Sequence, residues 1–248
     1  MSELFSIQLQ NRQQQGRDGI WLDLPTTTEQ VQAALRQIGI SSDNPQGLFI
    51  SGYFAEEEKR FAIPYNMVLA SNVDELNFLA SRLETLSTGE RAELNAALQA
   101  PQSELFSIGR ITDFPENVDY YVHLPDVHGP AQLGDYYLNR SGMVDMPEEW
   151  KGGIDTAQFG RYVAQQEQGA FTQYGYLVKS GDEWQKVHEG QPVPEEYRVL
   201  SFPALEILRD AANIPPPVQS TTEQQKVIPI ILNGKDSAER MKEITDRL

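Results

Sequence analysis

The sequence predicts an α+β fold built from several small modules in tandem, because strand-like and helix-like periods alternate along its 248 residues. Two kinds of observation lead to this prediction. Phe5, Ile7 and Leu9 alternate with polar residues, which is typical of a half-buried strand. Further along, capping residues with Glu or Gln three positions later repeatedly precede apolar stripes at helical spacing. Together these periodic runs divide the chain into four parts.

Residues 1–64 form the predicted N-terminal α+β module. A turn-rich segment separates the first strand from residues 20–22, which predicts a hairpin. Thr27 and Gln30 predict the start of a helix that ends at a glycine. Residues 47–53 are typical of one more strand.

Residues 65–112 form a mainly helical middle module. Asn72 and Glu75 predict the start of one helix, and leucines at helical spacing follow them. Ser87 and Glu90 predict the start of a second helix in the same way.

Residues 113–180 form an acidic α+β module. A helix is expected over 130–140, with Gly142 placed where a left-handed cap would lie. Asp155 predicts the start of a further helix, and residues 170–178 alternate as one strand.

Residues 181–248 form a proline-rich extension. Residues 215–222 (PPPVQSTT) predict a stiff, extended linker. A strand-like run at 227–232 and an amphipathic helix at 237–248 complete the chain, and this last piece is too small to fold alone.

A hexapeptide, SELFSI, occurs at residues 2–7 and again at 103–108. One interpretation is a duplicated strand that opens two modules. We favour chance similarity or local convergence, because the flanking residues differ at once.

Charge and composition exclude several classes of protein. The chain carries 36 Asp and Glu against 20 Lys and Arg, a net charge of −16, so it would repel nucleic acid. It has no cysteine, which excludes disulfides, thiolate zinc sites and cysteine nucleophiles. No segment approaches the ~18 apolar residues that span a membrane, and the N-terminus lacks a signal-peptide pattern. We therefore expect a cytoplasmic protein that binds neither a membrane nor nucleic acid.

Recognisable catalytic and cofactor motifs are missing. There is no nucleophile elbow, dinucleotide-binding glycine motif or HExxH zinc motif. His123 and His128, with Asp126 between them, leave a metal site open as an alternative to ordinary loop histidines. We expect a protein that is not an enzyme and that holds no cofactor and no metal.

The strongest signal is the distribution of acidic residues. Net charge is −6 over residues 1–100, −9 over 101–200 and −1 over 201–248. From 113 to 155, a range that we call the acidic segment, nine acids stand against only Arg140 and Lys151. These nine acids are the candidate partner-binding residues, expected along one face: Asp113, Glu116, Asp119, Asp126, Asp135, Asp145, Glu148, Glu149 and Asp155.

Carboxylates placed like phosphates can occupy a basic DNA-binding cleft. B-DNA carries one charge per ~1.7 Å, so the 16 net charges match about 27 Å of duplex and the 36 carboxylates about 61 Å. A symmetric dimer is needed to fill a longer cleft. The simpler interpretation is a solvated acidic surface that keeps the protein soluble.

Three blocks of the sequence resemble the ArdA antirestriction family. Residues 18–24 (DGIWLDL) are similar to the family's glycine, Trp and LDL segment, and residues 74–80 (DELNFLA) to its EELN helix. The third block is the most specific, and its parts follow the family's order: 133–137 (LGDYY), 146–150 (MPEEW), 154–161 (IDTAQFGR) and 169–172 (GAFT).

The resemblance implies an elongated protein of three α+β modules that forms a homodimer and mimics bent B-DNA. Proteins of this family occupy the DNA-binding site of type I restriction-modification enzymes, so they block cleavage and often methylation. The resemblance implies no metal or cofactor. The acidic segment falls in and before the third module.

Two other interpretations stay open. One is an acidic, non-enzymatic accessory protein of conjugation or mobile-element maintenance, which binds a basic partner other than a restriction enzyme. The other is an enzyme, which requires His123 and His128 to converge with carboxylates in a pocket.

Overall fold

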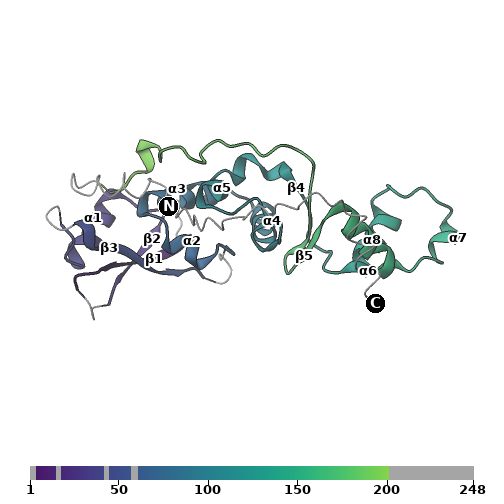
Figure 1. The fold of residues 1–248 in the computed structure, drawn as a ribbon, viewed down its shortest axis with the longest axis horizontal. Coiled ribbons are helices and arrows are strands. Elements are labelled where there is room, and N and C mark those ends of the chain that lie inside the picture. Colours follow the sequence, from purple (N-terminus) through teal and green to yellow (C-terminus); the bar gives the residue numbers. More distant parts are fainter. Residues whose placement is uncertain (1–3, 15–17, 42–44, 57–60, 201–248) are drawn as a thin grey trace, which may run out of the picture. The chain divides into compact units, whose positions relative to one another are not determined.

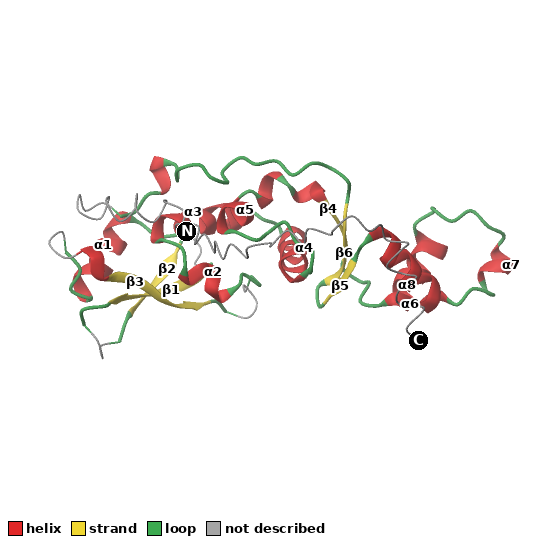
Figure 2. Ribbon diagram, viewed as in Figure 1, coloured by secondary structure: helices red, strands yellow, loops and turns green. Residues whose placement is uncertain are grey.

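The computed structural model describes residues 4–14, 18–41, 45–56 and 61–200. These residues form helices and two small antiparallel sheets, so the predicted α+β class is confirmed (Figures 1 and 2). The linker, strand-like run and helix predicted after residue 214 lie outside the described residues.

The first sheet has the strand order β2-β1-β3. Its strands are β1 (Phe5–Asn11), β2 (Ile20–Leu24) and β3 (Leu48–Phe54). β1 pairs antiparallel with both neighbours, which confirms the predicted hairpin. The alternation predicted for β1 buries Phe5, Ile7 and Leu9 on one face of the sheet.

Three helices begin where capping boxes predicted them. They are α1 (Thr28–Gln37), α3 (Val73–Glu84) and α4 (Thr88–Gln99). In each helix the capping side chain accepts a backbone N–H of the first turn, and the Gln or Glu three positions later accepts the cap's own N–H. A short helix, α2 (Tyr65–Leu69), precedes α3.

The second SELFSI copy is not a strand, so the interpretation as a duplicated strand is wrong. Ser107 instead caps a helix, α5 (Ile108–Thr112), and its hydroxyl accepts the Arg110 N–H at 3.3 Å. Phe5 is buried, whereas its counterpart Phe106 is 63% exposed. Residues 5–7 of the first copy pair with two strands, while the second copy leads into a capped helix. The surroundings therefore determine the structure of this hexapeptide.

Two 3-10 turns, η3 (Phe114–Glu116) and η4 (Val118–Tyr120), lead to the second sheet, whose order is β4-β6-β5. Its strands are β4 (Tyr121–Leu124), β5 (Ala170–Thr172) and β6 (Gly175–Lys179). The single strand predicted over 170–178 is therefore a hairpin. Gly175, at φ +118°, takes a turn conformation that alternation alone does not reveal.

The helix expected over 130–140 consists of α6 (Pro130–Asp135) and a π-helical turn, η5 (Tyr136–Arg140). Gly142 has the predicted left-handed conformation, with φ +70°. A four-residue helix, α7 (Glu148–Lys151), lies in the loop before α8 (Thr156–Glu167).

α6 and α8 cross with their backbones in close approach. A Cβ atom added to Gly160 would lie 1.8 Å from the carbonyl oxygen of Pro130. A Cβ atom on Gly134 would lie 2.0 Å from the carbonyl oxygen of Thr156. Only glycine allows this crossing.

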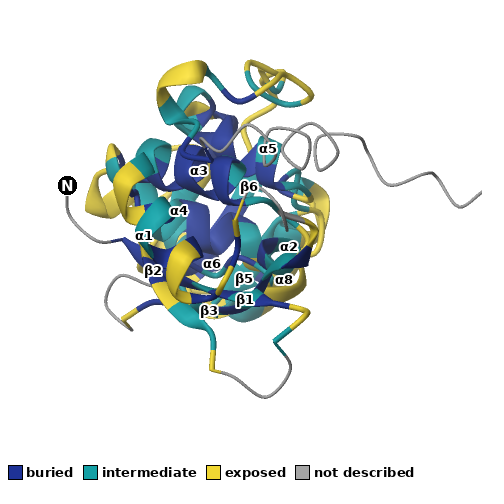
Figure 3. Cartoon of the chain, turned by 90° about the vertical axis from the view of Figure 1, so that its left-hand side faces the viewer, coloured by how far each residue is buried: buried dark blue, intermediate teal, exposed yellow. Residues whose placement is uncertain are grey.

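The buried side chains form two clusters. The larger takes its side chains from the first sheet, α1 to α5, β4 and Val199–Leu200 at the end of the described chain. α3 contributes to this cluster, and most of this helix is dark blue in Figure 3, because eight of its 12 residues are buried. The smaller cluster, around Val127, Leu133 and Tyr176, joins α6 and α8 to the second sheet.

Candidate functional site

The nine predicted site residues come from several elements. Three lie between α5 and β4, and Asp126 lies in the loop after β4. Asp135 ends α6, Asp145 and α7 lie in the loop that follows η5, and Asp155 caps α8 (Figure 2). In the structure, the nine residues fall into three groups that differ in burial and in ion pairing.

Asp113 does not belong to an exposed surface, so the prediction is wrong at this residue. Its side chain is fully buried, with 0% exposure. The carboxylate accepts backbone N–H groups of Val187 at 3.3 Å, His188 at 2.6 Å and Glu189 at 3.2 Å. A buried carboxylate needs such donors, and this one holds a distant chain segment in place.

Three other predicted residues form ion pairs within the protein. Glu116 pairs with Arg82, and Asp135 pairs with Arg140 at 2.8 Å. Glu148 pairs with Lys151 at 2.9 Å. Hydrogen bonds from Asn139 and then Arg140 lower the pKa of Asp135. A neighbouring cation compensates part of the field of each of these carboxylates.

Five predicted residues are exposed, and none of them has an ion-pair partner among the described residues: Asp119, Asp126, Asp145, Glu149 and Asp155. We call these five residues the open carboxylates. Asp155 also accepts the Gln158 N–H at 2.9 Å as the cap of α8. The other four show no contact that holds their side chains in place.

The basic side chains of this region are already engaged. Residues 101–200 contain seven Lys and Arg, and in the structure six of them pair with carboxylates: Arg110, Arg140, Lys151, Lys179, Lys186 and Arg198. Among the described residues, Arg161 alone of the seven has no carboxylate partner. Pairing leaves the net charge of residues 101–200 at −9, and these six bases pair with carboxylates other than the five open ones.

Sequence reasoning placed the site before residue 155 and so missed acids beyond β6. Asp182, Glu183 and Glu196 are exposed, and none of them pairs with a base among the described residues. Their charge is visible in the sequence, but only the structure shows that this segment returns along α5 and α3.

Large apolar side chains accompany the open carboxylates in the loop around α7. Met143 is 74% exposed and Trp150 is 67% exposed. Exposed Trp and Met side chains are common in protein-binding surfaces. This loop therefore offers apolar area as well as charge.

The histidines do not converge on a pocket. The ring of His123 contacts the carbonyl oxygen of Tyr174 at 2.7 Å, through Nε2. The backbone N–H of His128 binds Gln132 at 2.7 Å. Nowhere in the described ranges do three or more His, Cys, Asp or Glu side chains gather in a way that could hold a metal.

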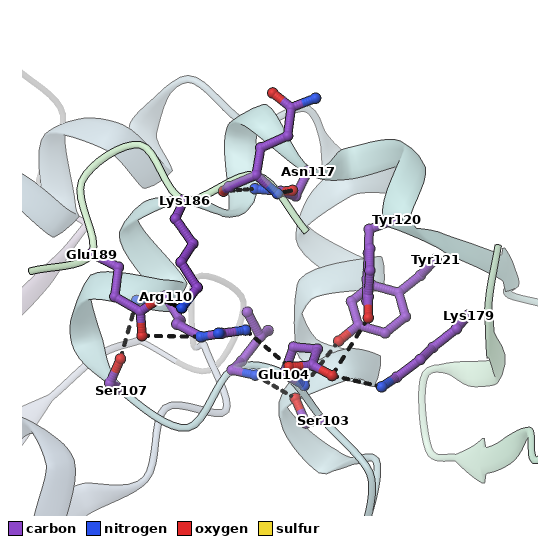
Figure 4. A network of polar contacts seen from close by, with 12 residues as sticks. Ser103, Glu104, Ser107, Arg110, Asn117, Tyr120, Tyr121, Lys179, Lys186 and Glu189 are labelled. Atoms are coloured by element: carbon purple, nitrogen blue, oxygen red, sulfur yellow. Dashed lines mark hydrogen bonds and ion pairs between the residues drawn. The ribbon is translucent and has the colours of Figure 1, made fainter. Parts of the chain in front are cut away.

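A network of polar side chains joins the second SELFSI copy to β6, centred on Glu104 (Figure 4). Its carboxylate pairs with Arg110 at 2.9 Å and with Lys179 at 2.7 Å. Arg110 also reaches Glu189 at 3.0 Å. The hydrogen bond from Lys179 is the main cause that lowers the pKa of Glu104, and the same bond raises the pKa of Lys179.

A cavity of about 230 Å³ lies between the end of α4, the second sheet and the end of α8. Glu167 lines it, but this carboxylate accepts hydrogen bonds from Tyr137 and Tyr176, and burial together with Glu167 raises the pKa of both phenols. Neither His123 nor His128 lines the cavity. The lining also contains Tyr121, whose hydroxyl accepts the Glu104 N–H at 3.2 Å, and Lys179, which pairs with Glu104 at 2.7 Å.

Glu93, on α4, has a carboxyl group whose pKa is strongly raised. Burial, followed by the charges of Glu90 and Asp119, raises its pKa to about 8. Its Oε1 atom is buried and has no hydrogen-bond partner. Because folding raises the pKa of Glu93, the stability of the folded protein depends on pH through this carboxyl group.

No helix among the described residues is long and apolar enough to cross a membrane.

These features are those of an acidic α+β protein whose surface carries open carboxylates. The family model of the antirestriction protein ArdA matches residues 15–178. The chain therefore belongs to the ArdA family of antirestriction proteins. No curated protein matches it in sequence.

Proposed function

We propose that this protein mimics B-DNA and blocks the DNA-binding site of type I restriction-modification enzymes. Membership of the antirestriction family supports this function. The observation that carries the proposal is the charge balance of residues 101–200, where six of seven bases are paired internally while the open carboxylates remain exposed. Such a surface attracts a basic cleft and repels DNA.

The mechanism requires no chemical step. The open carboxylates approach Lys and Arg side chains that otherwise bind phosphates, and release of counterions and water favours the complex, as it does for DNA. The protein acts without a cofactor or metal, in the cytoplasm, where incoming DNA meets the restriction enzyme. A homodimer doubles the length of duplex that the carboxylates can imitate.

A displacement titration tests the proposal. The purified protein is added to a type I restriction-modification enzyme that holds a fluorescent specific duplex, and release of the duplex is followed by anisotropy. We expect stoichiometric release that weakens steeply as salt rises, since exposed charges are screened within about 8–10 Å at physiological ionic strength. If several type I enzymes keep their DNA, the proposed partner is wrong, and an acidic accessory protein of mobile-element maintenance becomes the better interpretation.

A further inference from the structure

Residues 142–155, between η5 and α8, form a connection that we call the α7 loop. The loop bulges away from α6 and α8, and the short helix α7 lies at its far side (Figures 1 and 2). Connections between neighbouring helices usually have about 2–8 residues, so this loop is long for its place in the fold. Long surface loops often carry the binding residues of a protein.

The α7 loop makes only local contacts. None of its residues is buried. Its hydrogen bonds, and the ion pair between Lys151 and Glu148, join residues that are close in the sequence, and within the described ranges none of them connects residues 142–154 to either sheet or to α6. The described fold therefore leaves the most exposed side chains of this loop uncovered.

Several of these side chains are large and apolar. Met143 is 74% exposed and Trp150 is 67% exposed, while Val144, Met146 and Ile154 are half-buried. Single exposed apolar residues are ordinary, but several in one loop indicate a binding surface. Trp and Met are enriched in protein–protein interfaces, and Trp is among the residues that most often supply a large share of the binding energy.

The charges of the loop indicate the chemistry of the partner. Asp145, Glu149 and Asp155 are open carboxylates, and the one base of the loop, Lys151, already pairs with Glu148. With four acids and one base, the loop carries a charge of −3. Two copies of the loop that face each other across a two-fold axis would repel, whereas a basic protein surface is attracted.

We propose that the α7 loop docks in the basic cleft of the restriction enzyme with Trp150 as an anchor, whose indole ring enters an apolar pocket among the Lys and Arg side chains. This docking rests on the proposed function, since it takes the same partner. It goes beyond mimicry of DNA, because a duplex presents phosphates to such a cleft and keeps its bases stacked inside. The carboxylates steer the encounter, and burial of the indole slows dissociation.

Charge contacts and an apolar anchor respond differently to salt. Each charged contact that releases counterions makes the logarithm of the affinity fall more steeply with the logarithm of the salt concentration, with a slope of about one for each contact. Burial of an indole ring releases no counterions. The anchor therefore strengthens binding by the same factor at every salt concentration and leaves the slope unchanged.

The experiment repeats the displacement titration with the full chain over a series of salt concentrations. We expect Trp150→Ala to raise the half-displacing concentration at least about tenfold at every salt concentration, without a change of slope. Trp150→Phe should lose less, because its ring still fills the pocket. The double variant Asp145→Asn/Glu149→Gln should instead make the slope shallower.

Trp21→Ala is the matched control, because it removes an indole ring that is 49% exposed on β2, away from the α7 loop. We expect it to stay within about twofold of the parent protein in the titration. Its ring packs against Phe54 at a centroid distance of 6.3 Å, so the folding of each variant is checked by circular dichroism. Trp150→Ala should leave thermal melting unchanged, since no element of the described fold packs on the loop.

Three results would overturn the proposal. In the first, the parent protein displaces the duplex and Trp150→Ala does so equally well, so that the anchor is wrong while the proposed function stands. In the second, the parent protein displaces nothing, and the proposed function is wrong together with the anchor. In the third, the fluorescence that Trp150→Phe removes is shielded from acrylamide in the free protein, increasingly so at higher protein concentration, which would mean that a second copy covers the indole.

Discussion

Asp113 and Asp145 are both acidic residues of the acidic segment, yet the structure assigns them opposite roles. Asp113→Asn keeps the shape of the side chain but turns one carboxylate oxygen into an amide group. If Oδ1 still accepts the His188 N–H, the new amide faces the N–H groups of Val187 and Glu189, which Oδ2 accepts now. Two hydrogen bonds are lost, because the new amide group is a donor and so are the two backbone N–H groups that it faces.

The expected cost follows from these contacts. At about 1–1.5 kcal/mol for each lost bond, the free energy of unfolding falls by about 2–3 kcal/mol. Each kcal/mol lowers the melting temperature of a protein of this size by about 2–4 °C, so a fall of about 4–12 °C is expected. The assay is urea unfolding followed by circular dichroism, with thermal melting alongside.

Asp145→Asn is the matched control, because it removes the same charge from an exposed side chain that has no partner in the described part of the chain. We expect its free energy of unfolding to stay within about 0.5 kcal/mol of the parent value. In the displacement titration the order reverses: Asp145→Asn weakens inhibition, and Asp113→Asn leaves it unchanged while the protein is folded. Equal destabilisation by the two changes would refute the role assigned to Asp113.

Three further outcomes are expected. Gly160→Ala places a methyl group against the Pro130 carbonyl and should cost about 1–3 kcal/mol of stability in a melting experiment, whereas Gly152→Ala, in open space, should cost little. Burial raises the pKa of Glu93 to about 8 in the folded state, so folding loses stability as pH rises from about 4.5 to 8. Glu93→Gln should therefore stabilise the protein at pH 8 and leave it unchanged at pH 4, and a pH-independent difference would contradict this. Asp155→Asn should keep the cap of α8 and its stability but weaken inhibition, while Asp155→Ala should also cost about 1 kcal/mol of stability.

Local signals in the sequence predicted most helix starts. Thr27, Asn72, Ser87 and Asp155 cap helices as expected, because a cap and its partner lie within four residues. The sequence also predicted the hairpin of the first sheet, because alternating apolar residues and a turn-rich segment specify it. The hairpin within 170–178 was not predicted, because the alternation of apolar residues does not mark the turn at Gly175.

Contacts between residues far apart in the sequence could not be predicted from local patterns. Nothing near Asp113 in the sequence distinguishes it from the exposed acids that follow, because its partners lie 74 to 76 positions away. The same holds for Asp74, whose partners are 125 and 126 positions away. A count of charges therefore predicted an acidic surface but could not separate carboxylates that face solvent from those that bind the backbone of residues 187–189 and 199–200.

Charge placement is the central claim, and one comparison tests it most directly. Asp145, Glu148 and Glu149 are changed together to Lys in one protein, and Glu239, Glu243 and Asp246 in another, so that both change net charge equally. The measurement is the concentration that displaces half of a labelled duplex from a type I restriction-modification enzyme. The first protein should need at least about tenfold more than the parent protein, since reversal puts like charges against a basic cleft, and the second should stay within about twofold. Equal losses would contradict the account, because bulk charge and not the acidic segment would then cause inhibition.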